Sequence, residues 1–131
     1  MKLVTASYFQ EENWGPGKKI GISPGKPKDI PCDLKFDPLN PGDLYWSYMK
    51  AKKGDDPKAA GEAFVQGYSE QLKTFVEEVK KEAAAKNITP QEVLPLADGD
   101  TLLSWEAKGH MSFRGLAAEA LRELGYDVEE N

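Results

Sequence analysis

The chain has 131 residues, which suits one domain with a single hydrophobic core, and we predict that residues 1–131 form that domain. Hydrophobic residues make up 40% of the chain, charged residues make up 30%, and the formal net charge is −5. This balance gives no general attraction to phosphate backbones, so a nucleic-acid partner would need a local basic patch and is not favoured.

The cysteine and histidine content excludes several classes of site. A single cysteine, Cys32, rules out an internal disulfide. Cys32 and the single histidine, His110, are far apart in sequence and do not supply a zinc ligand set, so we expect neither a metal site nor a cofactor. Residues 1–6 lack the long apolar core of a signal peptide, and no apolar run approaches the roughly 18 residues of a spanning helix. We therefore expect a soluble, cytoplasmic protein without a membrane partner.

The N-terminal third predicts two short strands joined by a turn-rich loop. β-branched and aromatic residues indicate strands over residues 3–9 and 18–23, and Pro24 ends the second strand. Six prolines between Pro16 and Pro41 exclude regular structure over most of that stretch. Because apolar residues are spaced along it, we interpret it as an ordered extended segment lying on the core, with either a functional or a purely structural role.

Two helices are predicted in the middle of the chain. The first covers residues 43–52. Asp56 is a good N-cap and Pro57 a good first residue for the second helix, whose apolar residues recur every three or four positions until Asn87. Glycines in the first half of this helix leave a break near residues 67–69 open.

The C-terminal third predicts a short helix, a buried strand and a last helix. Thr89 and Glu92 have the spacing of a capping box. The apolar run that follows predicts a central strand over residues 101–106, buried on both faces as far as Trp105. Residues 112–124 then have the pattern of an amphipathic helix that a glycine ends, and a final edge strand is expected over 126–128.

Strands that alternate with helices predict the α/β class. We expect a small layered domain with a mainly parallel sheet of about three to five strands, flanked by helices. In such folds, ligands bind beyond the carboxyl ends of the strands, where free helix N–H groups face outward. The buried strand, loop and helix over residues 101–121 are therefore the expected place of a site.

Several short motifs follow one another in order along nearly the whole chain. They are Ser7-Tyr8-Phe9, Ile22-Ser23, Leu34-Lys35-Phe36-Asp37-Pro38-Leu39-Asn40-Pro41, Leu102-Leu103-Ser104-Trp105-Glu106, Ser112-Phe113-Arg114 and Leu116-Ala117-Ala118-Glu119-Ala120-Leu121. As an ordered set they resemble the compact members of an uncharacterised family, "domain of unknown function, family 488". The resemblance implies a fold and the position of a site, and it implies no established activity.

Two departures from the family's pattern fall at the expected site. The family has Cys-His-Arg where this chain has Ser112-Phe113-Arg114, and it has a strand cysteine where this chain has Ser104. If the family's cysteine and histidine carry out thiol or acid–base chemistry, the resemblance implies that this chain has lost it. The site would then be catalytically degenerate and keep Arg114, with His110 as the nearby side chain that could compensate.

The residues that we expect at the site are Arg114, Ser112, Glu106, Tyr8, Ser23 and Trp105. Arg114 opposes the helix dipole but, together with free N–H groups, would make an anion clamp; the alternative is a structural ion pair with Glu106 or Glu119. Ser112 is a better helix cap than a nucleophile. Tyr8, Ser23 and Trp105 would line the walls, although core packing explains an aromatic residue equally simply, and Glu106 would orient Arg114 or a polar group of the ligand.

Three functions of different classes follow from this reading. The leading hypothesis is the binding of an anionic small molecule such as a nucleotide, or of a nucleic-acid end, around Arg114. The first alternative is an interaction or accessory protein, for example of a phage type, that has no small-molecule site. The second is a hydrolase or nucleotide-processing enzyme that uses Glu106 and His110. Whether the protein is an enzyme is left open by the sequence.

Overall fold

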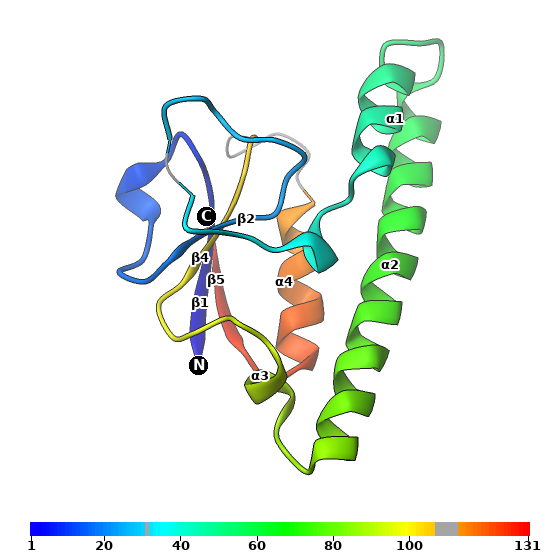
Figure 1. Ribbon diagram of the computed structural model, residues 1–131. Coiled ribbons are helices and arrows are strands. Elements are labelled where there is room, and N and C mark those ends of the chain that lie inside the picture. Colours follow the sequence, from blue (N-terminus) through cyan, green and yellow to red (C-terminus); the bar gives the residue numbers. More distant parts are fainter. Residues whose placement is uncertain (31, 107–112) are drawn as a thin grey trace.

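The computed structural model describes residues 1–30, 32–106 and 113–131 and forms a sheet with helices packed beside it (Figure 1). The strands and helices of these residues are β1 (Lys2–Ser7), the 3-10 helix η1 (Glu11–Asn13), β2 (Lys19–Gly21), β3 (Leu34–Lys35), the 3-10 helix η2 (Asp37–Leu39), α1 (Asp43–Ala51), α2 (Pro57–Lys86), α3 (Pro90–Val93), β4 (Thr101–Ser104), α4 (Arg114–Glu123) and β5 (Asp127–Glu130).

The five strands of the described residues form one sheet in the order β3-β2-β4-β1-β5, and every pair in it is parallel. In this register Leu102 of β4 lies beside Thr5 on one side and Ile20 on the other. The predicted α/β class, the mainly parallel sheet and the central, buried position of β4 are confirmed. The strand ends at Ser104, two residues earlier than predicted, and Trp105 is half-buried because it lines a pocket. The expected edge strand after the last helix is also present as β5, whereas the two-residue strand β3 at the other edge was not predicted.

Side chains that alternate along the strands belong to two separate apolar clusters, one on each face of the sheet. Leu102 belongs to the main core beneath the helices, together with the apolar faces of α2 and α4. Leu103, the next residue, belongs to a smaller cluster on the opposite face, which Trp14 and Ile30 cover from the loops. In Figure 1 the helices lie on one side of the sheet and the loop containing η1 lies on the other. Leu39, near the end of the proline-rich segment, is completely buried and belongs to the main core.

Helix α2 runs unbroken past the glycines in its first half. Asp56 caps it through the backbone N–H of Ala59, and Asn87 ends it in the left-handed conformation with a φ of 55°. A Cβ atom added at Gly67 would lie 3.0 Å from the side chain of Leu44 on α1. The glycine that predicts a weak point in the helix is thus a place where a side chain of α1 packs closely against α2.

Phe113 joins the sheet side of the core to the helical hairpin. Its ring lies 5.4 Å from that of Tyr68 and 5.9 Å from that of Tyr45, measured between centroids, and both contacts are edge-to-face. Such contacts add a modest stabilisation to the area that the rings bury. Because Phe113 directly precedes α4, this cluster fixes the start of α4 against α1 and α2.

The carboxyl ends of β1 and β4 lie side by side, and the next described elements of the chain after each strand pack on opposite faces of the sheet. The segment after β1 covers the loop side with Trp14, whereas α4, the next described helix after β4, packs on the helix side (Figure 1). In α/β folds, ligands bind beyond the carboxyl ends of the parallel strands. Ser104 and Glu106 lie at this end of the central strand and contact Arg114 at the start of α4.

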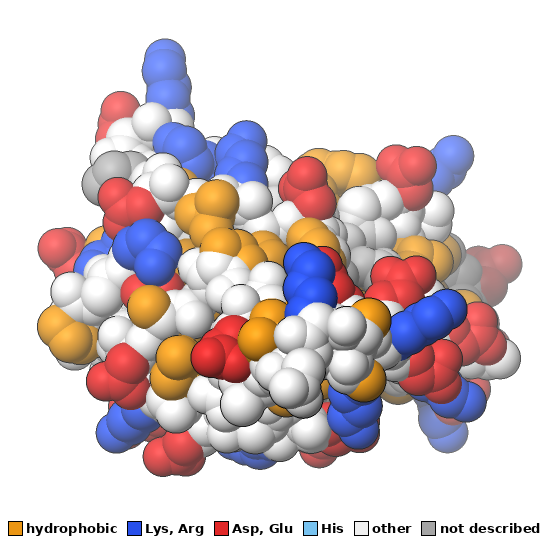
Figure 2. Space-filling model, turned by 60° about the horizontal axis from the view of Figure 1, so that its bottom comes forward, with side chains coloured by type: hydrophobic (Ala, Val, Ile, Leu, Met, Phe, Trp, Pro, Cys, Tyr) orange, Lys and Arg blue, Asp and Glu red, His pale blue; other side chains and the backbone are white. Residues whose placement is uncertain are grey.

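The surface in Figure 2 carries acidic and basic side chains interspersed, and neither sign gathers into a large patch on the face shown. This agrees with a protein that has no strong general attraction for phosphate backbones. In the described part of the chain, no helix combines the length and apolar character needed to cross a membrane.

Asp100, which precedes β4, is a buried carboxylate at the opposite end of the sheet. It accepts hydrogen bonds of 2.8 Å from the backbone N–H groups of Lys18 and Ala97, and the Lys18 ammonium lies 2.8 Å from its second oxygen. Burial raises the pKa of Asp100, but these hydrogen bonds and the Lys18 charge outweigh burial, so that the pKa lies below its ordinary value. The carboxylate ties the loop before β2 to the start of β4.

Replacing Asp100 by Asn should lower the free energy of unfolding at pH 7 by about 1.5–3 kcal/mol, the value of hydrogen bonds to a charged group. The pKa of Asp100 is lower in the folded than in the unfolded chain, so its stabilisation is complete above the unfolded pKa and is lost as the pH falls through the folded pKa. Urea denaturation from pH 7 to pH 2 measures this. Asp55→Asn, at an exposed turn, is the control, and equal losses in the two variants at pH 7 would contradict the assignment.

Candidate functional site

A buried polar network lies where β4 ends and α4 begins. The Arg114 guanidinium donates from Nη1 to the Ser104 hydroxyl and, over 2.7 Å, to the Glu106 carbonyl oxygen. Ser104 in turn donates to Glu106 Oε2 over 2.6 Å, and this carboxylate oxygen lies 3.7 Å from Arg114 Nη1. A weaker contact of 3.4 Å joins Nη2 to the carbonyl oxygen of Asn131. The network thus joins the central strand, the residues after it and the chain's last residue.

Arg114 is 4% exposed, so its charge needs compensation inside the protein. Burial lowers the pKa of the guanidinium and the Glu106 charge opposes that effect, with a net lowering that still leaves an arginine protonated. Of the two ion pairs considered from the sequence, the structure shows the one with Glu106, while Glu119 is exposed on α4. Direct binding of an anion by Arg114 stays a prediction.

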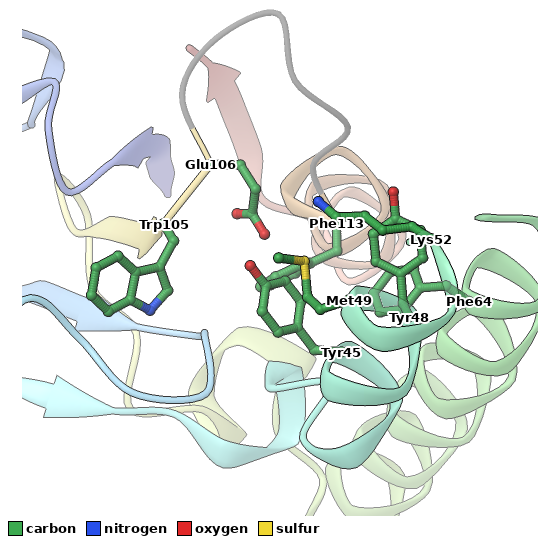
Figure 3. A pocket seen from close by; sticks show the side chains of 8 residues that line it. All are labelled: Tyr45, Tyr48, Met49, Lys52, Phe64, Trp105, Glu106 and Phe113. Atoms are coloured by element: carbon green, nitrogen blue, oxygen red, sulfur yellow. The ribbon is translucent and has the colours of Figure 1, made fainter. Parts of the chain in front are cut away.

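A pocket of about 360 Å³ opens beside this network (Figure 3). We call it the α1–β4 pocket, and its lining residues are Tyr45, Tyr48, Met49, Lys52, Phe64, Trp105, Glu106 and Phe113. Figure 3 shows the Trp105 ring on one side, the aromatic rings of the helices on the other, and the Glu106 carboxylate between them. The volume falls in the range of small-molecule sites.

The Glu106 carboxylate is a hydrogen-bond acceptor in the α1–β4 pocket, and two hydroxyl groups lie beside it. The Ser104 hydroxyl donates to this carboxylate over 2.6 Å. The Tyr45 hydroxyl faces the carboxylate from α1 (Figure 3). Burial, then the Glu106 charge and a hydrogen bond to that carboxylate, raise the pKa of Tyr45 to about 12. Tyr45 therefore remains a neutral hydroxyl donor across the physiological pH range.

Lys52 supplies the positive charge of the same pocket. Its ammonium lies 5.6 Å from the centre of the Tyr48 ring, in a cation–π contact. Figure 3 places it at the side of the pocket away from Trp105. Among the described residues, no carboxylate lies within ion-pair distance of this ammonium.

Of the three residues predicted to line the walls, Trp105 lines the pocket, whereas Tyr8 and Ser23 lie outside its lining. The Tyr8 ring packs edge-on against the Trp105 ring at 6.1 Å between centroids. Burial raises the pKa of Tyr8, a hydrogen bond with Ser23 lowers it, and the nearby Cys32 raises it, with a net rise. Ser23 also donates to the carbonyl oxygen of Gly25 over 2.8 Å. Tyr8 and Ser23 thus support the position of Trp105.

The predictions for Ser112 and His110 fall outside the described residues. Sequence reasoning missed the contribution of α1 and its C-cap residue, from which Tyr45, Tyr48 and Lys52 line the pocket. Their spacing of three, four and seven positions puts them on one face of a helix, which was the available signal. Leu44 of the same helix instead contacts α2 at Gly67.

Comparisons with models of protein families, with curated proteins and with solved structures found no match for this chain. The resemblance to "domain of unknown function, family 488" therefore stays a prediction. Within residues 1–30, 32–106 and 113–131, no group of three or more metal-ligating His, Cys, Asp or Glu side chains comes together.

Arg114→Ala should lower the free energy of unfolding by about 3–5 kcal/mol, because it leaves Glu106 with its compensating charge removed in a largely buried position. Arg122→Ala is the matched control on the same helix. Arg122 pairs with Glu130, and both side chains are well exposed, so that its loss should cost about 1 kcal/mol. Urea denaturation of both variants measures the difference, and a loss for Arg114→Ala no greater than that of the control would show that the pair has no structural role.

Proposed function

We propose that the protein binds a flat, anionic small molecule of the nucleotide class in the α1–β4 pocket. The balance of charge in the pocket supports this most directly. The Glu106 charge is compensated by Arg114 at 3.7 Å, whereas the Lys52 ammonium has no carboxylate partner among the described residues. A pocket with one compensated anion and one uncompensated cation favours a ligand that carries a negative group.

The walls of the pocket favour a ligand with a planar ring. Trp105 on one side and Tyr45 on the other present aromatic surfaces at the carboxyl end of the sheet (Figure 3). Aromatic side chains stack on heterocyclic bases with a typical contribution of about 1–3 kcal/mol per base. Glu106 between them would accept hydrogen bonds from N–H groups of such a ring.

In this proposal Arg114 acts through Glu106. Arg114 Nη1 donates to the Ser104 hydroxyl and to the Glu106 carbonyl oxygen, and the guanidinium charge lies beside the Glu106 carboxylate. Arg114 thus holds this carboxylate in place from within the core. The anion-binding charge then comes from Lys52, and Arg114 is a positioning residue for the pocket. The proposal concerns binding and assigns no reaction to the protein.

Lys52→Ala should weaken the binding of nucleoside monophosphates by about tenfold or more, because a charge-assisted hydrogen bond to the phosphate is lost. Binding of the corresponding nucleosides, which lack the phosphate, should change little. Lys53→Ala, the neighbouring exposed lysine that does not line the pocket, is the control. Isothermal titration of AMP, GMP, adenosine and guanosine measures the affinities, and the shift of the Trp105 indole N–H signal locates the binding.

An equal loss of affinity in Lys52→Ala and Lys53→Ala would contradict the assigned phosphate position. If none of the four compounds moves the Trp105 signal, the proposed function is wrong.

The interaction-protein hypothesis would then be the leading one. It is favoured by two large rings on the surface, Phe9 at 61% and Trp46 at 55% exposure. Phe9 also packs on Trp105 and Trp46 on Tyr45, so that this surface borders the pocket.

A further inference from the structure

We infer that the α1–β4 pocket selects a guanine-type ring, one that presents two adjacent N–H donors, over adenine, cytosine or uracil rings. The inference rests on the proposed function and names the class of base that the pocket accepts. It is carried by the hydrogen-bonding capacity that remains on Glu106.

The described residues use only part of the hydrogen-bonding capacity of the Glu106 carboxylate. An ionised carboxylate accepts about four hydrogen bonds and donates none. Ser104 occupies one site at 2.6 Å, and the Tyr45 hydroxyl faces another. Arg114 Nη1 lies 3.7 Å from Oε2, which is an ion-pair distance and longer than a hydrogen bond. About two acceptor sites therefore remain among the described contacts, and N–H donors of a ligand in the pocket can fill them.

The edges of the common bases differ in how they meet two acceptors. Guanine offers its ring N1–H and its 2-amino group side by side. Adenine and cytosine offer an amino group beside a ring nitrogen that is itself an acceptor, and uracil offers one N–H between two carbonyl oxygens. Each of these three would put a lone pair against the carboxylate and leave a polar group unpaired, which costs more than an absent hydrogen bond.

The surrounding charges distinguish such a ring from an organic cation, the other ligand that a carboxylate among aromatic rings could attract. Arg114 lies behind Glu106, and Lys52 lines the same pocket. A cationic ligand would face both of these positive groups. A guanine nucleotide carries a neutral pair of N–H donors and, elsewhere on the molecule, an anionic phosphate. The donors match the Glu106 carboxylate, and the phosphate matches the Lys52 ammonium.

The first experiment compares three nucleotides on the wild-type protein by isothermal titration. GMP, IMP and AMP share the ribose and phosphate; IMP lacks only the 2-amino group, and AMP replaces the ring N1–H with an acceptor. GMP should bind about tenfold or more tightly than IMP, the fold-change expected for one hydrogen bond to a charged group, and AMP should bind more weakly than IMP. Choline is the cationic probe and should not bind.

The second experiment changes the acceptor. Glu106→Gln replaces one carboxylate oxygen with an amide donor, which opposes a guanine N–H and suits the ring nitrogen of adenine. GMP should bind about tenfold to a hundredfold more weakly, and the preference for GMP over AMP should disappear or reverse. Glu119→Gln makes the same change of charge on an exposed position outside the pocket and should leave the preference intact.

The outcomes separate this inference from the proposed function. Equal binding of GMP, IMP and AMP, with a moved Trp105 signal, would overturn the guanine selectivity and leave the nucleotide pocket. Choline binding more tightly than GMP would overturn the selectivity in favour of a cation site. If Glu106→Gln does not fold, because Arg114 loses its partner, the GMP, IMP and AMP series on the wild-type protein decides. Failure of every nucleotide to bind would overturn the proposed function itself.

Discussion

The burial of one guanidinium constrains the rest of this structure. Arg114 has almost no contact with solvent, and a buried charge is tolerated only with an opposite charge and hydrogen-bond acceptors around it. Ser104 and Glu106 supply these, and both belong to the chain at the end of the central strand. The strand end, the acceptor of the pocket and the start of α4 are therefore parts of one electrostatic unit, and none of them can shift without leaving a charge uncompensated.

Aromatic packing fixes the wall of the pocket that α1 forms to the start of α4, and so to the Arg114 network. Phe113 directly precedes Arg114, and its ring contacts Tyr45 and Tyr68 from the two helices of the hairpin. The Phe113 side chain thus contacts the helical layer, and the Arg114 side chain contacts the end of the sheet. This explains how α1, which follows the proline-rich segment, comes to face the end of β4, and why a pocket forms between them.

The predicted fold followed from signals that lie close together in sequence. The apolar run of β4, the periodicity of α2 and the capping box of α3 each report local burial or local hydrogen bonding. The pocket depends on tertiary contacts that no local pattern encodes. The position of α1 depends on the approach of Leu44 to Gly67, and the partner of Arg114 depends on the side to which Ser104 points from β4. Sequence reasoning therefore located the strand end and Glu106 but left the ion pair open and missed Lys52.

The local balance of charge matters more to this pocket than the net charge of the chain. A net charge of −5 argues against polyanionic partners, because it acts at long range on the approach of a charged molecule. At physiological ionic strength, however, exposed charges beyond about 8–10 Å are largely screened. Within that distance the carboxylate is already compensated by Arg114, and the Lys52 ammonium lies against an aromatic ring, where water screens it less than at an open surface. The proposed binding of a small anion is therefore compatible with the acidic net charge, because a short ligand meets only the charges of the pocket, whereas a long polyanion also meets the charges around it.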